Sequence, residues 1–417
     1  MTKTEHGLVC ELADNRRAFH STMKITFVTD TYIPQPNGVA TTMYRLVTGL
    51  RQLGHSVDVI RPAVLECSEE GIGVPSVSLP GYYGVRVGLP MRLRLQARWY
   101  RSRPDVIYVA TETPLGASAI TAARAIGIPV ASGFHTNFQQ YLAHYQMPLL
   151  ESAAISYLRR LHNRSSSTFV PSRDTIDDLK GKGFENLYLL PKGVDTRQFN
   201  PKKRSVLLRT QWGAGNNSIV GLYVGRIAAE KNLDLIVRTF SEIAARFPDF
   251  KGVFVGDGPK LNELKVQHPE FIYPGVLHGE ELATHYASAD LFVFPSITET
   301  FGNVTLEAMA SGLAVLAYDY AAAKQHIRDG QNGYVAPFDD SRAYLEKAIE
   351  MTRDPNLANV REAARSSARK VRWKKVVKRF QKQLVEMIER DGHDITGFEL
   401  PTDGTPRLRD QPSDSLP

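Results

Sequence analysis

Two cations stand five positions apart in the segment GRIAAEKN, residues 225–232. The segment follows an apolar run at 218–224 and precedes a helix-forming segment, so we expect a strand, a turn and the start of a helix. Arg226 and Lys231, together with free backbone N–H groups at a helix start, can bind one anion, and a diphosphate suits them best. Taken alone, both residues could instead be solvated loop charges.

Two carboxylates lie in a second segment, PSITETFGNVTLEAMASG, residues 295–312. Glu299 would lie in the loop after a strand at 291–294, and Glu307 about one turn into the following helix. If the nine residues were helical throughout, the carboxylates would be about 12 Å apart and could bind two portions of one extended ligand. Each carboxylate accepts hydrogen bonds from sugar or ribose hydroxyls, although either alone could be a surface or capping acid. The backbone N–H groups between them, suited to phosphate, belong to Phe301, Gly302, Asn303 and Val304.

Two further candidates follow expected strands in the first half of the chain. His135 comes directly after an apolar strand at 129–134. Gly38 lies in the loop of FVTDTYIPQPNGVATT, residues 27–42, after the first strand. A histidine on its own is often structural, but its place at a strand end favours a functional role.

Alternating strands and helices position these residues and predict an α/β fold. The first unit is a strand at 24–30, a loop at 31–39 and a helix at about 40–53. After a boundary near 192–203, which contains glycine, proline and several charges, the pattern starts again at 218. Two doubly wound domains are therefore expected, with a cleft at the carboxyl ends of their strands. Other expected strands lie near 56–60, 105–110, 129–134, 167–170, 188–190, 252–255, 291–294, 314–318 and 334–335.

Composition narrows the class of protein. The chain has 417 residues, of which 42% are apolar and 23% charged, as in soluble globular proteins of two or three domains. No apolar run approaches the roughly 18 residues of a membrane span. With Cys10 and Cys67 as its only cysteines, the chain has no disulfide framework, and we expect a reducing, cytoplasmic compartment. Residues 1–22 lack the pattern of a signal peptide.

The net charge of +7 is concentrated in two segments. Residues 86–103 contain six arginines and no acid, and residues 360–390 contain eleven Lys or Arg against three Glu. In the first segment Arg92, Arg94 and Arg98 are mixed with apolar residues, as suits an anionic membrane surface. A solvated helix face is the alternative. We expect no nucleic-acid partner.

Other nucleotide enzymes are disfavoured. The chain has no G-x-x-x-x-G-K-[ST] loop, and its nearest approach to G-x-G-x-x-G, at 213–218, precedes a strand and lacks the third glycine. No aspartate pair at i and i+2 and no HExxH motif is present, so we expect no metal site and metal-independent activity.

Taken together, the motifs resemble those of retaining nucleotide-sugar glycosyltransferases of family GT4, which have the GT-B fold. The resemblance runs from about residue 23 to 385, and it includes the E-x7-E spacing of Glu299 and Glu307. It is greatest for bacterial GDP-mannose-dependent α-mannosyltransferases and sulfoquinovosyl or glucosyl diacylglycerol synthases. Further landmarks are GFHT at 133–136, VPS at 170–172, PKGVD at 191–195 and GDGP at 256–259.

The resemblance implies a role for each candidate residue. Arg226 and Lys231 would hold the donor diphosphate, Glu307 the ribose and Glu299 the transferred sugar. His135 would lie near the reaction centre, and Gly38 would let its loop approach the phosphates. Two departures stand out: 319–326 reads DYAAAKQH where many relatives have Gly-Gly-x-x-Glu, and 37–38 is Asn-Gly instead of two glycines.

The resemblance also divides the chain. We expect an extension at 1–22, an acceptor-side domain at 23–195, a nucleotide-sugar-binding domain at 196–371, a helix at 372–390 that returns to the first domain, and a disordered tail at 391–417. The expected activity is hexose transfer, with mannose from GDP-mannose preferred, to a lipid or envelope glycan, at the inner face of the membrane. A UDP-sugar-dependent glycolipid synthase and a non-catalytic anion- or membrane-binding protein are the alternatives.

Overall fold

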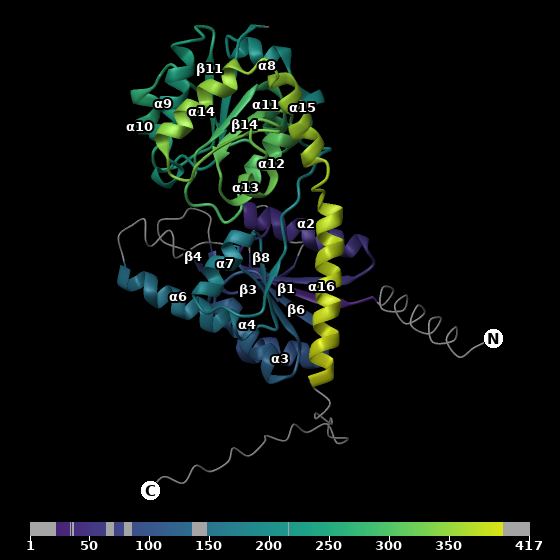
Figure 1. Ribbon diagram of the computed structural model, residues 1–417. Coiled ribbons are helices and arrows are strands. Elements are labelled where there is room, and N and C mark those ends of the chain that lie inside the picture. Colours follow the sequence, from purple (N-terminus) through teal and green to yellow (C-terminus); the bar gives the residue numbers. More distant parts are fainter. Residues whose placement is uncertain are drawn as a thin grey trace, which may run out of the picture.

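Two parallel β-sheets, each covered by helices, make up the protein (Figure 1). The computed structural model describes residues 22–33, 35, 37–63, 71–78, 86–135, 148–215 and 217–394. Nearly all of the extension and tail expected at 1–22 and 391–417 lies outside these residues. The predicted α/β class with two doubly wound sheets is confirmed.

The N-terminal sheet has seven parallel strands in the order β3-β2-β1-β6-β7-β8-β9. Its strand order reverses between β1 and β6, which pair directly. The central strands are buried on both faces, which explains why they are apolar runs rather than alternating ones. The strands are β1 (Lys24–Val28), β2 (Ser56–Pro62), β3 (Ile72–Val74), β6 (Val106–Val109), β7 (Val130–Gly133), β8 (Ser167–Val170) and β9 (Leu187–Leu189); β4 (Ser76–Ser78) and β5 (Arg86–Gly88) form a separate antiparallel pair.

Helices cover this sheet, and the first of them begins at the cleft. Helix α2 (Gly38–Gln52) starts two residues earlier than expected, because the Asn37 side chain accepts hydrogen bonds from the N–H groups of Val39 and Ala40. This cap fixes the backbone at Gly38. The other helices are α3 (Arg92–Arg101), α4 (Pro114–Ala125), α6 (Pro148–His162) and α7 (Arg173–Gly181).

The C-terminal sheet has six parallel strands in the order β12-β11-β10-β13-β14-β15. The order reverses between β10 and β13, so the loops that follow these two strands lie side by side at the carboxyl edge. These are the two loops that carry the sequence motifs. The strands are β10 (Val220–Val224), β11 (Lys251–Val255), β12 (Ile272–Gly275), β13 (Leu291–Phe294), β14 (Ala314–Tyr318) and β15 (Tyr334–Ala336).

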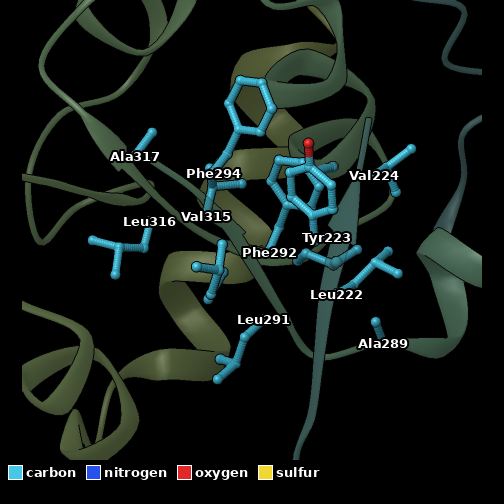
Figure 2. Close-up of a cluster of buried hydrophobic side chains, with 14 of the residues drawn as sticks. Leu222, Tyr223, Val224, Ala289, Leu291, Phe292, Phe294, Val315, Leu316 and Ala317 are labelled. Atoms are coloured by element: carbon cyan, nitrogen blue, oxygen red, sulfur yellow. The ribbon is translucent and has the colours of Figure 1, made fainter. Parts of the chain in front are cut away.

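Aromatic side chains fill the core beneath the motif loops (Figure 2). The rings of Tyr223 and Phe294 are stacked with centroids 6.3 Å apart, and Phe292 and Phe294 stack at 5.7 Å. This rigid layer supports the loops above it. Around the sheet lie η1 (Pro201–Lys203), α8 (Val206–Gln211), η2 (Ala229–Lys231), α9 (Leu233–Ala244), α10 (Leu261–Gln267), α11 (Gly279–Ser288), α12 (Asn303–Ala310), α13 (Ala321–His326), α14 (Ser341–Arg353) and α15 (Leu357–Ala368).

The last helix crosses back to the first domain. After α15, helix α16 (Trp373–Asp394) runs along the N-terminal sheet, seen in yellow in Figure 1. The ring of Phe380 lies 5.1 Å from that of Tyr108 and 6.2 Å from that of Phe27, centroid to centroid. The side chains that α16 buries in this core are Val376, Val377, Phe380, Leu384 and Met387.

Candidate active site

Lys231 and Glu299 come together from adjacent loops. Lys231 ends the short η2 helix after β10, and Glu299 lies in the loop after β13. The Lys231 Nζ lies 2.5 Å from Oε1 of Glu299, and the Ser296 hydroxyl donates to the same oxygen at 2.8 Å. Their side chains are only 11% and 17% exposed. The pair is therefore held in one geometry, with little water to weaken it.

Arg226, by contrast, projects into solvent. Its side chain is 41% exposed, and its guanidinium lies 3.5 Å from the carboxylate of buried Glu230. The backbone beneath it is fixed, because the Tyr223 hydroxyl from the aromatic layer donates to the Arg226 carbonyl oxygen at 2.8 Å. Arg226 can thus reach a ligand above the loop while the loop itself stays in place.

The GDGP segment at 256–259 and the residue after it are hydrogen-bonded to the loop that carries Arg226. The Ile227 N–H donates to the Asp257 carbonyl at 2.8 Å, and the Lys260 N–H donates to the Ile227 carbonyl at 3.1 Å. Gly256 and Gly258 have positive φ angles, and a Cβ on either would overlap a carbonyl oxygen of the loop. Only glycine permits this approach.

The start of α12 faces the first domain. Gly302, with φ of +84°, precedes the helix and offers no side-chain cap, so the first N–H groups of α12 point to the cleft without a side-chain acceptor. A Cβ at Gly38 would lie 3.3 Å from Nδ2 of Asn303, so the loop before α2 comes close to this helix start. The Phe301 side chain is buried, and Val304 packs against the core.

Glu307 lies further along α12, on the side of the first domain's helix α2. The Tyr286 hydroxyl donates to its Oε2 at 3.1 Å. Burial raises the pKa of Glu307 to about 7, while the Tyr286 hydrogen bond and the charge of Arg45 act in the opposite direction. Arg45, from α2 of the other domain, forms a 2.9 Å ion pair with Asp195. The sequence motifs do not identify Tyr286 or Arg45, because only the fold brings them to Glu307.

His135 follows β7 and is buried. Its Nε2 lies 2.8 Å from the Tyr108 hydroxyl, and its Nδ1 has no hydrogen-bond partner among the described residues. Burial lowers the pKa of His135 to about 3, helped by the charges of Lys192 and His162. The imidazole is therefore neutral at physiological pH.

Lys192 is a further functional candidate, to which the sequence motifs assign no role. It follows β9 in the PKGVD landmark and is buried. Burial lowers its pKa to about 8, against the opposing effect of the Glu299 charge. Its Nζ lies 6.0 Å from the centre of the Phe301 ring. A lysine three residues after the end of a parallel strand was the signal that could have identified it.

Groups from both domains thus come close to one another at this site. His135 and Lys192 come from the N-terminal domain, and Glu299 with its partner Lys231 comes from the C-terminal one. Within the described residues no group of three or more His, Cys, Asp or Glu is placed to hold a metal ion. None of the helices described there combines the length and apolarity needed to span a bilayer.

Known proteins share both halves of this architecture. Residues 36–198 match the family model "Glycosyltransferase Family 4", and residues 218–354 match "Glycosyl transferases group 1". The structure of HepE from Anabaena, in complex with UDP and glucose, superimposes with a TM-score of 0.68 at 18% identity, over 87% of this chain and 99% of that one. Sucrose-phosphate synthase from Thermosynechococcus elongatus gives 0.71 at 16% identity, over 88% and 100%. These likenesses define the GT-B fold.

Relatives at higher identity define the family. A GDP-mannose-dependent alpha-mannosyltransferase of Corynebacterium glutamicum is 34% identical over 80% of this chain and 81% of its own length. An alpha-monoglucosyldiacylglycerol synthase of Streptococcus pneumoniae is 31% identical over 78% of each chain. The chain belongs to glycosyltransferase family 4. It is a nucleotide-sugar-dependent hexosyltransferase, which confirms the predicted enzyme class and contradicts the non-catalytic alternative.

Proposed function

We propose that this enzyme transfers mannose from GDP-mannose to a hydroxyl group of a lipid or envelope glycan, with retention at the anomeric carbon. The observation that most directly supports glycosyl transfer at this site is that His135 and Lys192 of one domain come close to Lys231 and Glu299 of the other. Mannose is preferred because the Corynebacterium relative and a second one, of Mycobacterium tuberculosis, are GDP-mannose-dependent mannosyltransferases.

The donor diphosphate would lie between Arg226, Lys231 and the start of α12. The free N–H groups there add to the two cations and favour negative charge. Gly38 would leave room for the phosphates, because its loop already comes close to Asn303. The ribose hydroxyls would donate to Glu307, which Tyr286 orients.

The transferred sugar would contact Glu299 and His135. Lys231 and Ser296 fix the Glu299 carboxylate, so its second oxygen can accept from a sugar hydroxyl. Neutral His135 is held through Nε2 by Tyr108, which leaves Nδ1 for the sugar. Lys192, beside Glu299, would add a third cation for charge that develops on the leaving diphosphate.

The proposed step takes place on one face of the sugar. The acceptor oxygen bonds to the anomeric carbon on the face from which the diphosphate leaves. The bond from that carbon to the diphosphate oxygen breaks, its electron pair stays on the diphosphate, and the acceptor proton passes to a phosphate oxygen. Positioning and charge stabilisation, each contributing several kcal/mol in favourable sites, would supply the catalysis. Arg226, Lys231 and Lys192 supply the positive charge that a divalent ion supplies elsewhere, so we propose metal-independent turnover.

We propose that helix α3 binds the anionic inner face of the cell membrane. Its buried side consists of Leu95 and Trp99, whereas Leu93 is 78% and Tyr100 64% exposed. These apolar side chains are flanked by exposed arginines, a combination suited to anionic lipid headgroups. In Figure 1 α3 lies at the end of the N-terminal domain away from the C-terminal domain. The exposed arginines are Arg92, Arg94, Arg98 and Arg101.

A donor comparison tests the proposed substrate. Purified enzyme is given GDP-mannose and UDP-glucose side by side, and release of each nucleoside diphosphate is measured with and without membrane lipid extract. We expect GDP release to exceed UDP release at equal donor concentration. The reverse result would select the UDP-sugar-dependent glycolipid synthase, which the pneumococcal relative makes the second candidate.

A further inference from the structure

A cavity lies where the polypeptide connects the two domains, which we call the hinge. It has a volume of about 1100 Å³ and is lined by α2, the first connection between the domains at 194–202, the end of α15 and the start of α16. The lining contains neither the Lys231–Glu299 pair nor His135. It is therefore distinct from the site around the Lys231–Glu299 pair, although the charge of one lining residue, Arg45, also acts on Glu307.

Positive charge dominates this hinge cavity. Asp195 is the one carboxylate among its lining residues, and it is already paired with Arg45 at 2.9 Å. Five lining cations have no hydrogen-bond or ion-pair partner for their side chains within the described ranges of the chain: Arg197, Lys202, Arg369, Arg372 and Lys374.

One arginine of the lining shows how closely these charges are gathered. Arg365 donates to the carbonyl oxygens of Thr196 and Phe199 and so ties α15 to the connection between the domains. Its pKa is lowered by burial and then by the charges of Arg369 and Arg372. An anion bound among these like charges would reduce the repulsion between them.

We propose that the hinge cavity binds a soluble phosphate compound carrying two or more negative charges. Arginine side chains can bind phosphate with two parallel hydrogen bonds, and those of the cavity come from separate segments. The volume is large enough to admit a phosphorylated small molecule. An occupant would contact α2 of one domain and α15 of the other, so its binding favours one arrangement of the domains over others.

Inorganic pyrophosphate is the probe for the test, with the melting temperature of the full-length protein as the readout. Four proteins are compared at constant ionic strength. The first two are the wild type and Lys231→Ala, a variant with a weakened donor site. The other two are the cavity variant Arg369→Gln/Arg372→Gln and the control Lys378→Gln/Arg379→Gln. The control removes the same charge from exposed positions of α16 that do not line the cavity.

We expect pyrophosphate to raise Tm by at least about 2 °C in the wild type, Lys231→Ala and the control, and to lose this effect in the cavity variant. Loss of the shift in Lys231→Ala with retention in the cavity variant would assign the anion to the donor cleft and overturn the proposal. An equal loss of the Tm shift in the control, or no Tm shift in the wild type, would overturn the proposal too.

Sedimentation with phosphatidylglycerol vesicles should be the same for the cavity variant and the control. A selective loss of sedimentation in the cavity variant would point to a lipid headgroup as the ligand and would overturn the proposal of a soluble phosphate compound.

Discussion

The ammonium group of Lys192 lies 6.0 Å from the centre of the Phe301 ring, although the two residues belong to different domains. The Glu299 charge acts on the same ammonium group. A cation of the N-terminal domain is thus held against the loop of the C-terminal domain that we assign to the donor. The relationship makes Lys192 sensitive to both pH and domain arrangement.

Replacement of Lys192 should separate activity from stability. We expect Lys192→Met to lower kcat/KM at least about tenfold, since a cation next to the leaving group is lost. The same variant should be more stable than the wild type at pH 7, because burial lowers the Lys192 pKa from 10.5 to about 8 and folding therefore penalises its charged form. This penalty is fully present below about pH 8 and disappears as pH rises to 10.5. Urea unfolding at pH 7 and pH 10.5 measures it, and a less stable Lys192→Met at pH 7 would contradict the assignment.

The donor cations should each matter to turnover. Arg226→Ala and Lys231→Ala are expected to lower kcat/KM at least about tenfold, because each removes a charge-assisted contact to the diphosphate. Arg226→Ala should lower the melting temperature only slightly, since its side chain is 41% exposed and lies 3.5 Å from Glu230. Lys231→Ala should melt lower, because Glu299 loses a cation at 2.5 Å. Arg246→Ala, in an exposed ion pair of the same domain, is the control. Near wild-type turnover of both variants would remove the donor-site assignment.

Ribose binding should depend on pH through Glu307. Its pKa is raised to about 7, so kcat/KM should rise with pH through 7 as the carboxylate forms. Glu307→Gln should show lower kcat/KM and lose this rise. The free energy of unfolding should change with pH in the opposite direction. The stabilising contribution of Glu307 is fully present below 4.5, the ordinary pKa of the carboxyl group, and is lost as pH rises through about 7. Unchanged pH profiles of kcat/KM for wild type and Glu307→Gln would rule out the role.

Turnover should not require a divalent ion. Enzyme treated exhaustively with EDTA is expected to keep its rate, because the arginine and lysine side chains at the donor site supply the positive charge. Rates are measured before and after treatment, and again after magnesium or manganese is added. Complete loss of activity that either metal restores would show the proposal to be wrong.

Binding to anionic vesicles should depend on α3. Sedimentation with phosphatidylglycerol vesicles should weaken as salt rises and fall strongly in Arg92→Glu/Arg94→Glu/Arg98→Glu, since each basic residue near such a surface contributes about 1 kcal/mol. Hydrolysis of soluble donor should survive. The triple change Lys378→Glu/Arg379→Glu/Lys382→Glu on exposed positions of α16 is the matched control. If the wild type fails to sediment at low salt, a soluble glycan acceptor becomes the better proposal.

The sequence predicted the parts of the fold that depend on local patterns. Apolar runs identified the central strands, and the restart at 218 indicated the second sheet, because buried parallel strands are continuous apolar segments. The short edge strands β3 and β12 were missed, since three or four half-buried residues carry little periodicity. The pair β4 and β5 was missed for the same reason.

The sequence predicted those site residues that lie in a recognisable motif after a strand. Lys231 and Glu299 follow neighbouring strands, so their meeting follows from the sheet order. Arg45, Tyr286 and Lys192 could not be assigned from spacing, because their partners lie in distant segments or in the other domain. Their positions depend on how the two sheets face each other, and no local sequence pattern predicts this arrangement.

The return of α16 has a consequence for how the chain folds during synthesis. Phe380 completes the aromatic cluster around Phe27 and Tyr108, yet it is made about 270 residues after Tyr108. The N-terminal domain therefore acquires its last core side chains only after the whole C-terminal domain has been translated. Until then its apolar face stays uncovered, and a chain that stops at residue 371 would leave it so permanently.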